Sequence, residues 1–193
     1  KNLGSEQVVG TSREERFRAE FPIDRDRMRE DCLARVRAEL ERAGLAAALV
    51  FDPLNLRYTT SSGIATVLNL HTAMRWALVP VDSEPIVWEL ADAMGVLRKH
   101  WPDGDFRPAQ DWHFFTSGHR DRDDARRFAE EIADVLRERG ILGEKIGVDR
   151  LDIIALMALH DAGLRIDDAQ RPIETARAVK TEQERQALRL SAR

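Results

Sequence analysis

The strongest constraint on this chain is a change from a helical to a strand pattern across a single glycine. Between residues 24 and 43, apolar side chains recur at every fourth position, which predicts a helix with one apolar stripe: Met28, Cys32, Val36 and Leu40. Gly44 supplies the stop signal of that helix. The apolar run 46–51 follows at once and ends at Asp52-Pro53, which predicts a buried strand. A helix joined to a buried strand by so short a turn indicates an α/β domain.

The rest of the chain continues this alternation. Strands are predicted at 76–81 and 86–89, and the turn-forming residues 82–85 between them favour an antiparallel hairpin. Further elements are predicted as helices at 91–101, 121–140 and 151–161 and as strands at 111–115, 145–148 and 164–166. We therefore expect a mixed β-sheet flanked by helices on both faces, a three-layer α/β fold.

The two ends of the chain carry different signals. Residues 1–22 are mostly polar, which predicts a weakly structured amino-terminal arm, and they begin without Met, so the chain looks cut from a longer one. At the other end, Thr181 and Glu184 have the spacing of a capping box, which predicts a helix that starts at Thr181. No stop signal follows before Arg193, so we expect further sequence downstream.

Charge and composition exclude several classes of function. The 30 basic and 34 acidic side chains leave a net charge of -4, so we expect no nucleic-acid partner. No run approaches the roughly 18 apolar residues of a membrane span, so we expect no membrane partner either. Cys32 is the only cysteine, which excludes an intrachain disulfide and favours a reducing, cytoplasmic setting.

The sequence shows no recognisable catalytic motif of its own. None of the five histidines lies three or four residues from another, as a helical metal site requires, so we expect no metal ligands in this segment. His113 and His119, six residues apart across a loop, are interpreted as solvated or core histidines. Gly140, Gly143 and Gly147 match no phosphate-binding loop and are interpreted as a turn. We predict no catalytic residues here.

Two motifs, taken together, resemble the amino-terminal domain of the creatinase, prolidase and aminopeptidase P family. The first is the strand at 48–51 followed by an Asn-x-x-Tyr loop, in which Asn55 can tie the loop to its own backbone while Tyr58 packs beneath it. The second is the stretch 177–184, which is similar to the R-x-x-K-[ST]-x-x-E hinge before the family's catalytic domain. The resemblance implies a ribonuclease H-like domain at 23–176, an arm at 1–22 and the start of a hinge helix at 177–193.

The resemblance also implies a function. In this family two aspartates, a histidine and two glutamates in the carboxy-terminal domain hold two divalent metal ions (Mn, Co or Zn), and these ligands would lie beyond Arg193. The amino-terminal domain would serve homodimerisation and lend a loop, here 60–75, to the partner subunit's active site. Within that loop His71 and Arg75 are candidate substrate-binding residues, because a guanidinium can bind a carboxylate bidentately.

Alternatives remain open at this point. His71 capping a strand and Arg75 pairing with a nearby acid explain the same residues without a substrate. The expected parent enzyme is a dinuclear-metal hydrolase, an Xaa-Pro dipeptidase or aminopeptidase acting on small peptides, with this segment inactive alone. The residues 51–55 with Asn69, His71 and Arg75 also look close to the dimethylsulfoniopropionate lyases of the family, and creatinase is a further relative. A stand-alone interaction module without enzymatic activity is the alternative of a different class.

Overall fold

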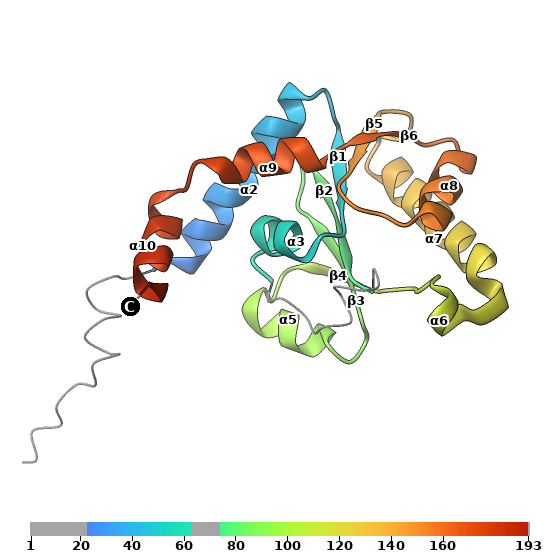
Figure 1. Ribbon diagram of the computed structural model, residues 1–193, viewed down its shortest axis with the longest axis horizontal. Helices are drawn as coiled ribbons and strands as arrows, with labels where there is room; N and C mark the ends of the chain where they lie inside the picture. Colours follow the sequence, from blue (N-terminus) through green and yellow to red (C-terminus); the bar gives the residue numbers. More distant parts are fainter. Residues whose placement is uncertain (1–22, 63–73, 193) are drawn as a thin grey trace, which may run out of the picture.

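The computed structural model of the chain describes residues 23–62 and 74–192, and within them one six-stranded sheet forms the centre of the molecule (Figure 1). The strand order is β4-β3-β2-β1-β5-β6. The strands span β1 Ala47–Val50, β2 Trp76–Pro80, β3 Ile86–Glu89, β4 Asp105–Pro108, β5 Lys145–Val148 and β6 Arg165–Asp168. Only β2 runs against its neighbours, since β1 pairs with β5, β5 with β6 and β3 with β4 in parallel. The predicted hairpin at 76–89 is confirmed.

Helices cover both faces of this sheet, so the predicted three-layer α/β fold is confirmed. One face packs against α7 (Asp121–Glu138) and α8 (Ile153–Asp161), and the other against α2 (Arg25–Arg42), α3 (Pro53–Thr60), α5 (Met94–His100) and α9 (Gln170–Ala178). The side chains of β1 alternate between the two hydrophobic cores that these helices form with the sheet. Leu49 packs in the core with α7 and α8, and Val50 packs in the core on the other face, because successive side chains of a strand point to opposite faces. All four residues of β1 are buried, as expected for a central strand.

The strand predicted at 111–115 is wrong. The strand in this region is β4, which pairs with β3 from Ile86↔Asp105 to Glu89↔Pro108. Residues 111–113 form a loop and Phe114–Ser117 the short helix α6, because the Asp111 carboxylate accepts hydrogen bonds from the His113 backbone N–H and the Thr116 hydroxyl. Phe114 and Phe115, whose aromatic character favoured a strand, are 62% and 85% exposed.

The loop predicted after β1 is also wrong, because residues 53–60 form the helix α3. Asp52 caps this helix, and its Oδ1 atom accepts hydrogen bonds from the Leu54 and Asn55 backbone N–H groups. Pro53 occupies the first helical position, where its missing N–H costs nothing. The helix ends at Ser61, which has a left-handed backbone with φ 53°.

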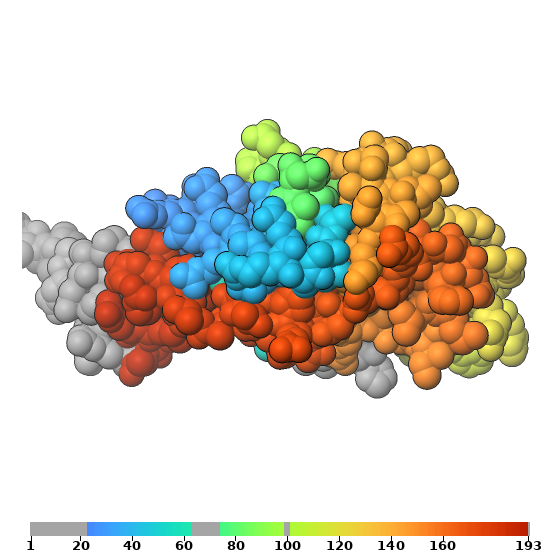
Figure 2. Space-filling model, turned by 90° about the horizontal axis from the view of Figure 1, so that it is seen from above, coloured from blue at the N-terminus to red at the C-terminus, as the bar shows by residue number. Residues whose placement is uncertain are grey.

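The amino- and carboxy-terminal helices lie side by side. The predicted capping box is confirmed at the start of α10 (Glu182–Ser191): the Thr181 hydroxyl accepts from the Glu184 N–H, and the Glu184 carboxylate accepts from the Thr181 N–H. Figure 2 shows α2 and the α9–α10 segment next to each other, and Asp24 N–H donates to Gln183 Oε1 at 2.9 Å. The arm predicted at 1–22 lies outside the described residues. None of the described helices has the length and hydropathy of a membrane-spanning segment.

Gly147 is part of strand β5, so its interpretation as a turn residue is wrong, whereas Gly140 and Gly143 have the positive φ values (71° and 94°) that turns favour. A Cβ atom on Gly147 would lie 2.7 Å from Ala169 Cβ and 3.2 Å from its Cα. Since backbone cannot move aside as a flexible side chain can, we expect Gly147→Ala to lower the free energy of unfolding by about 1–3 kcal/mol. Urea denaturation measures this loss. Gly95→Ala, with no atom within 4 Å of the added Cβ, is the control that should show no such loss.

Candidate functional site at the carboxyl edge of the sheet

The buried polar side chains of the domain gather at one edge of the sheet. Five strands end there and β2 begins there, so the loops after β1, β3, β4 and β5 meet at this edge. Open α/β sheets bind their ligands outside the carboxyl ends of their strands. Most of the buried polar residues of the described chain lie in α3 or the turn after it, directly before β2, at the end of β3 or directly after β5: Asn55, Thr59, Thr60, Ser62, Arg75, Glu89 and Asp149.

Asp149, directly after β5, is the centre of one network. Its carboxylate is 7% exposed and accepts hydrogen bonds from Phe51 N–H (2.8 Å), Asp52 N–H (3.2 Å) and the Asn55 side-chain amide (3.0 Å). The Asn55 Oδ1 atom in turn accepts from the Arg177 guanidinium at 2.7 Å. Burial raises the pKa of Asp149 above its ordinary value, although these hydrogen bonds oppose that change. The network joins β5, α3 and α9.

This network corrects the expectation for the Asn-x-x-Tyr motif. Asn55 does not tie the loop to its own backbone, a role that Asp52 performs; its side chain instead links Asp149 to Arg177. The Tyr58 hydroxyl donates to the Ala176 carbonyl at 3.1 Å, and the Arg177 guanidinium lies 6.0 Å from the centre of its ring. The two sequence motifs of the family resemblance therefore contact one another in the fold.

Cys32, on α2, lies next to Tyr58. It is 4% exposed, and burial, together with the nearby Glu184 carboxylate, raises the pKa of its thiol to about 11. A thiol in this setting stays protonated at neutral pH. Burial likewise raises the pKa of Tyr58 above its ordinary value. Both groups are therefore neutral packing elements under α9.

Arg75, the residue before β2, and Glu89, the last residue of β3, form a buried ion pair. Arg75 Nε lies 2.8 Å from Glu89 Oε2, and the two side chains are 3% and 2% exposed. Burial lowers the pKa of Arg75, but a guanidinium keeps its proton. Burial raises the pKa of Glu89, against the opposing effects of Arg75 and the Leu90 N–H. The structure thus contains the pairing with a nearby acid that the sequence left open. His71 lies outside the described residues, and substrate binding by either residue stays a prediction.

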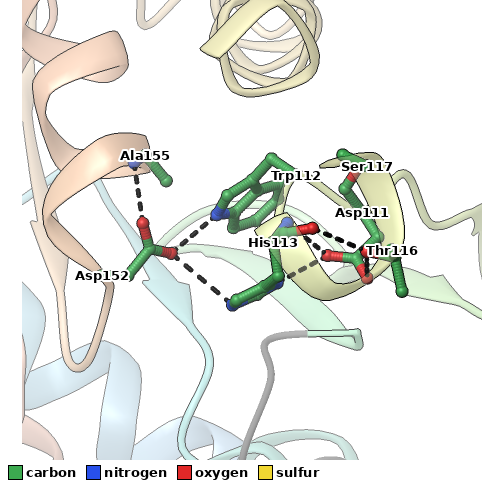
Figure 3. Close-up of polar contacts among 7 residues, drawn as sticks. All are labelled: Asp111, Trp112, His113, Thr116, Ser117, Asp152 and Ala155. Carbon is green, nitrogen blue, oxygen red and sulfur yellow. Dashed lines mark hydrogen bonds and ion pairs between the residues drawn. The ribbon is translucent and has the colours of Figure 1, made fainter. Parts of the chain in front are cut away.

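A second polar cluster, which sequence reasoning missed, surrounds His113 (Figure 3). The imidazole Nδ1 atom lies 2.5 Å from Asp111 Oδ1, and Nε2 lies 3.8 Å from Asp152 Oδ2. Asp152 caps α8 by accepting from Ala155 N–H at 3.0 Å, and it also accepts from the Trp112 indole N–H at 2.6 Å. The only local signal in the sequence is the Asp-x-His spacing of residues 111–113; Asp152 is distant along the chain.

The electrostatics of this cluster favour a charged histidine. The hydrogen bond to Asp111 raises the pKa of His113, burial opposes this, and the Asp111 and Asp152 charges add to the increase. For Asp111, burial acts to raise the pKa, but the bonds from His113 and Thr116 outweigh it and lower the pKa. Since each ring nitrogen faces a carboxylate, the ring is placed to hold charge between two aspartates.

The described residues contain no group of three or more His, Cys, Asp and Glu side chains arranged to hold a metal ion. The donors at the carboxyl edge of the sheet are engaged in the pairs and caps described above. The described residues therefore offer no fitting set of ligands for the divalent ions that the family resemblance implies.

Residues 33–179 match the Creatinase/Prolidase N-terminal domain, and the chain belongs to this family. Two curated relatives are similar to it: the dimethylsulfoniopropionate lyase DddP of Roseobacter denitrificans, 30% identical over 77% of this chain, and that of Roseovarius nubinhibens, 28% identical over 86%. The matches cover 33% and 37% of those proteins, so the chain spans about a third of the length of these relatives.

Solved structures share the fold. The N-terminal domain of the cytoplasmic peptidase PepQ from Mycobacterium tuberculosis aligns with a TM-score of 0.52 at 17% identity, covering 75% of this chain and 97% of that one. The dipeptidase PepE from Mycobacterium ulcerans aligns with a TM-score of 0.56 at 20% identity, covering 80% of this chain and 38% of that one. At such identities the similarity shows a common fold, not a common substrate.

Proposed function

We propose that these residues are the non-catalytic amino-terminal domain of a cytoplasmic metal-dependent enzyme, in which they serve homodimerisation and shape the partner subunit's active site. The observation that carries this proposal is the family match over 33–179 combined with the use of the described polar side chains in structural pairs and caps. The segment 60–75, proposed to reach the partner's active site, leads into Arg75 at the carboxyl edge of the sheet, where α/β proteins bind ligands.

Two reactions are candidates for the whole protein. The relatives with 30% and 28% identity are named as dimethylsulfoniopropionate lyases, which favours that reaction. The structural neighbours are peptidases, including an Xaa-Pro aminopeptidase from Streptococcus pyogenes with a TM-score of 0.55, but at 14% identity. Because identity is the better guide within one fold, we place the lyase first and the Xaa-Pro peptidase second.

The 193-residue chain is expected to convert neither substrate. It should be incubated with Mn²⁺ or Co²⁺ and either dimethylsulfoniopropionate or an Ala-Pro dipeptide, and substrate loss followed by proton NMR. Sustained turnover would contradict the proposal that catalysis belongs to another part of the protein. The full-length protein in the same assay then distinguishes the lyase from the peptidase, and sedimentation of both proteins tests the proposed dimer.

The same assay tests His71 as a substrate-binding residue. In the active full-length protein, His71→Ala is expected to lower kcat/KM roughly tenfold, the value of one lost hydrogen bond of about 1.4 kcal/mol, without changing Tm. His160→Ala, at an exposed position on α8, is the matched control. Unchanged kcat/KM for the His71 variant would remove this residue from the proposed site.

A further inference from the structure

The His113 cluster joins two parts of the domain that the sheet holds far apart. Asp111, Trp112 and His113 follow β4, which is the edge strand on one side of the sheet. Asp152 follows β5 on the other side and caps α8. The Trp112–Asp152 hydrogen bond and the His113–Asp152 ion pair link this loop to the start of α8 (Figure 3).

We propose that His113 is a charge-dependent clamp, in which the protonated ring strengthens the attachment of the start of α8 to the β4–α6 loop and the neutral ring weakens it. The geometry gives the reason. A charged imidazole has an N–H on each nitrogen, one toward Asp111 and one toward Asp152. A neutral imidazole has a single N–H, and Asp111 at 2.5 Å retains it, so a lone pair then faces the Asp152 carboxylate.

Two carboxylates and one aromatic ring contact the imidazole. Asp111 on its own loop and Asp152 at the start of α8 face the ring, and both charges act to raise the pKa of His113. Trp112 stacks on the imidazole with ring centres 5.6 Å apart and planes inclined by 21°, and an aromatic face also favours a cation. Because Trp112 is 1% exposed and packs on Phe128 of α7, the clamp acts directly on the hydrophobic core.

The proposal predicts how the histidine titrates. The His113 ring resonance should have its midpoint above the ordinary value of 6.5. Asp152→Asn keeps one oxygen for the helix cap but removes the charge and the oxygen that accepts from the Trp112 N–H, so it should lower that midpoint by roughly 0.5 pH unit or more. An unchanged His113 midpoint in the Asp152→Asn variant overturns the clamp.

The proposal also predicts the pH dependence of stability. A histidine with a raised pKa in the folded state stabilises the fold fully below its unfolded pKa near 6.5 and loses that effect as the pH rises through the folded value. His113→Gln should therefore melt about 2–4 °C below the wild type at about pH 5.5, and this gap should narrow above pH 6.5. If the Tm difference between wild type and His113→Gln stays constant with pH, while His160→Gln melts at the wild-type temperature, His113 stabilises the fold by packing alone. That result would also overturn the proposal.

The NMR signal of the Trp112 indole N–H is a second probe of the His113 titration. Its N–H bonds to the carboxylate that His113 pairs with, so its NMR shift should follow the His113 titration with the same midpoint. In His113→Gln the indole shift should lose this titration while the rest of the spectrum remains that of the folded domain. If the indole resonance still titrates in His113→Gln, another group causes the change at Trp112, and the proposal is overturned.

Discussion

Replacing Arg75 with methionine is expected to lower the free energy of unfolding by about 3–5 kcal/mol, because it leaves the Glu89 carboxylate buried without its counter-ion. Methionine keeps most of the apolar volume of the arginine stem, so loss of packing contributes little. A typical domain is stable by only about 5–15 kcal/mol, so this variant should approach the limit of folding. Urea denaturation of the 193-residue chain measures the effect.

The double variant R75M/E89Q separates charge burial from other causes. Glutamine is neutral and retains the oxygen that accepts from Leu90 N–H, so most of the lost stability should return. The pH dependence gives a second check. In Arg75→Met the pKa of Glu89 should rise further above its ordinary value, and a carboxyl group with a raised folded-state pKa destabilises the fold as the pH rises through that value. The deficit should therefore shrink as the pH falls.

Arg107→Met is the matched control for this pair. Arg107 pairs with Asp105 near the same strands, but its side chain is 28% exposed, so the expected loss is only about 0–1 kcal/mol. If Arg75→Met and Arg107→Met lower the free energy of unfolding by the same amount, burial of the Arg75–Glu89 pair has no special effect on stability.

Replacing Asp149 with alanine is expected to lower the free energy of unfolding by about 3 kcal/mol. The change removes the common acceptor of the Phe51 N–H, the Asp52 N–H and the Asn55 amide, and each buried donor without a partner costs roughly 1–3 kcal/mol. The gain from no longer burying a carboxylate offsets part of this sum. Chemical denaturation measures the total, and hydrogen exchange should accelerate in α3 and at the carboxyl end of α9.

Two further variants serve as comparisons for Asp149→Ala. Asn55→Ala breaks only the link from Asp149 to Arg177, so it should accelerate exchange in the same two helices at a smaller cost in stability. Asp134→Ala, at a 67% exposed position on α7, should change stability by no more than about 1 kcal/mol. Exchange that accelerates uniformly over the whole domain in Asp149→Ala would contradict a local role for this network.

Local patterns in the sequence predicted much of the fold. The four-residue repeat before Gly44 and the apolar run after it produced α2 and β1, and the capping box placed the start of α10. The patterns misled where side chains and tertiary contacts compete with intrinsic preference. At 111–115, aromatic residues favour a strand, but the Asp111 carboxylate stabilises a turn and β3 takes 105–108 as its neighbour.

The candidate site was much less accessible to sequence reasoning. The sequence singled out Arg75 and allowed it an acidic partner, but only the pairing of β2 with β3 makes that partner Glu89. Asn55 was noted as part of a motif, yet its partners Asp149 and Arg177 lie 94 and 122 residues further along the chain. His113 was interpreted as an ordinary histidine because nothing near it in the sequence indicates Asp152.

The amino-acid sequence by itself determined most of the helices and strands, their alternation and hence the three-layer class, since these depend on hydrophobic period and on caps formed within a few residues. The tertiary structure decided which polar and charged side chains meet at the carboxyl edge of the sheet: Arg75 with Glu89, Asp149 with Asn55, and His113 with Asp152. The physical reason is that strand order brings distant loops to one edge. Burial there makes each pairing strong, and neither strand order nor burial can be read from neighbouring residues.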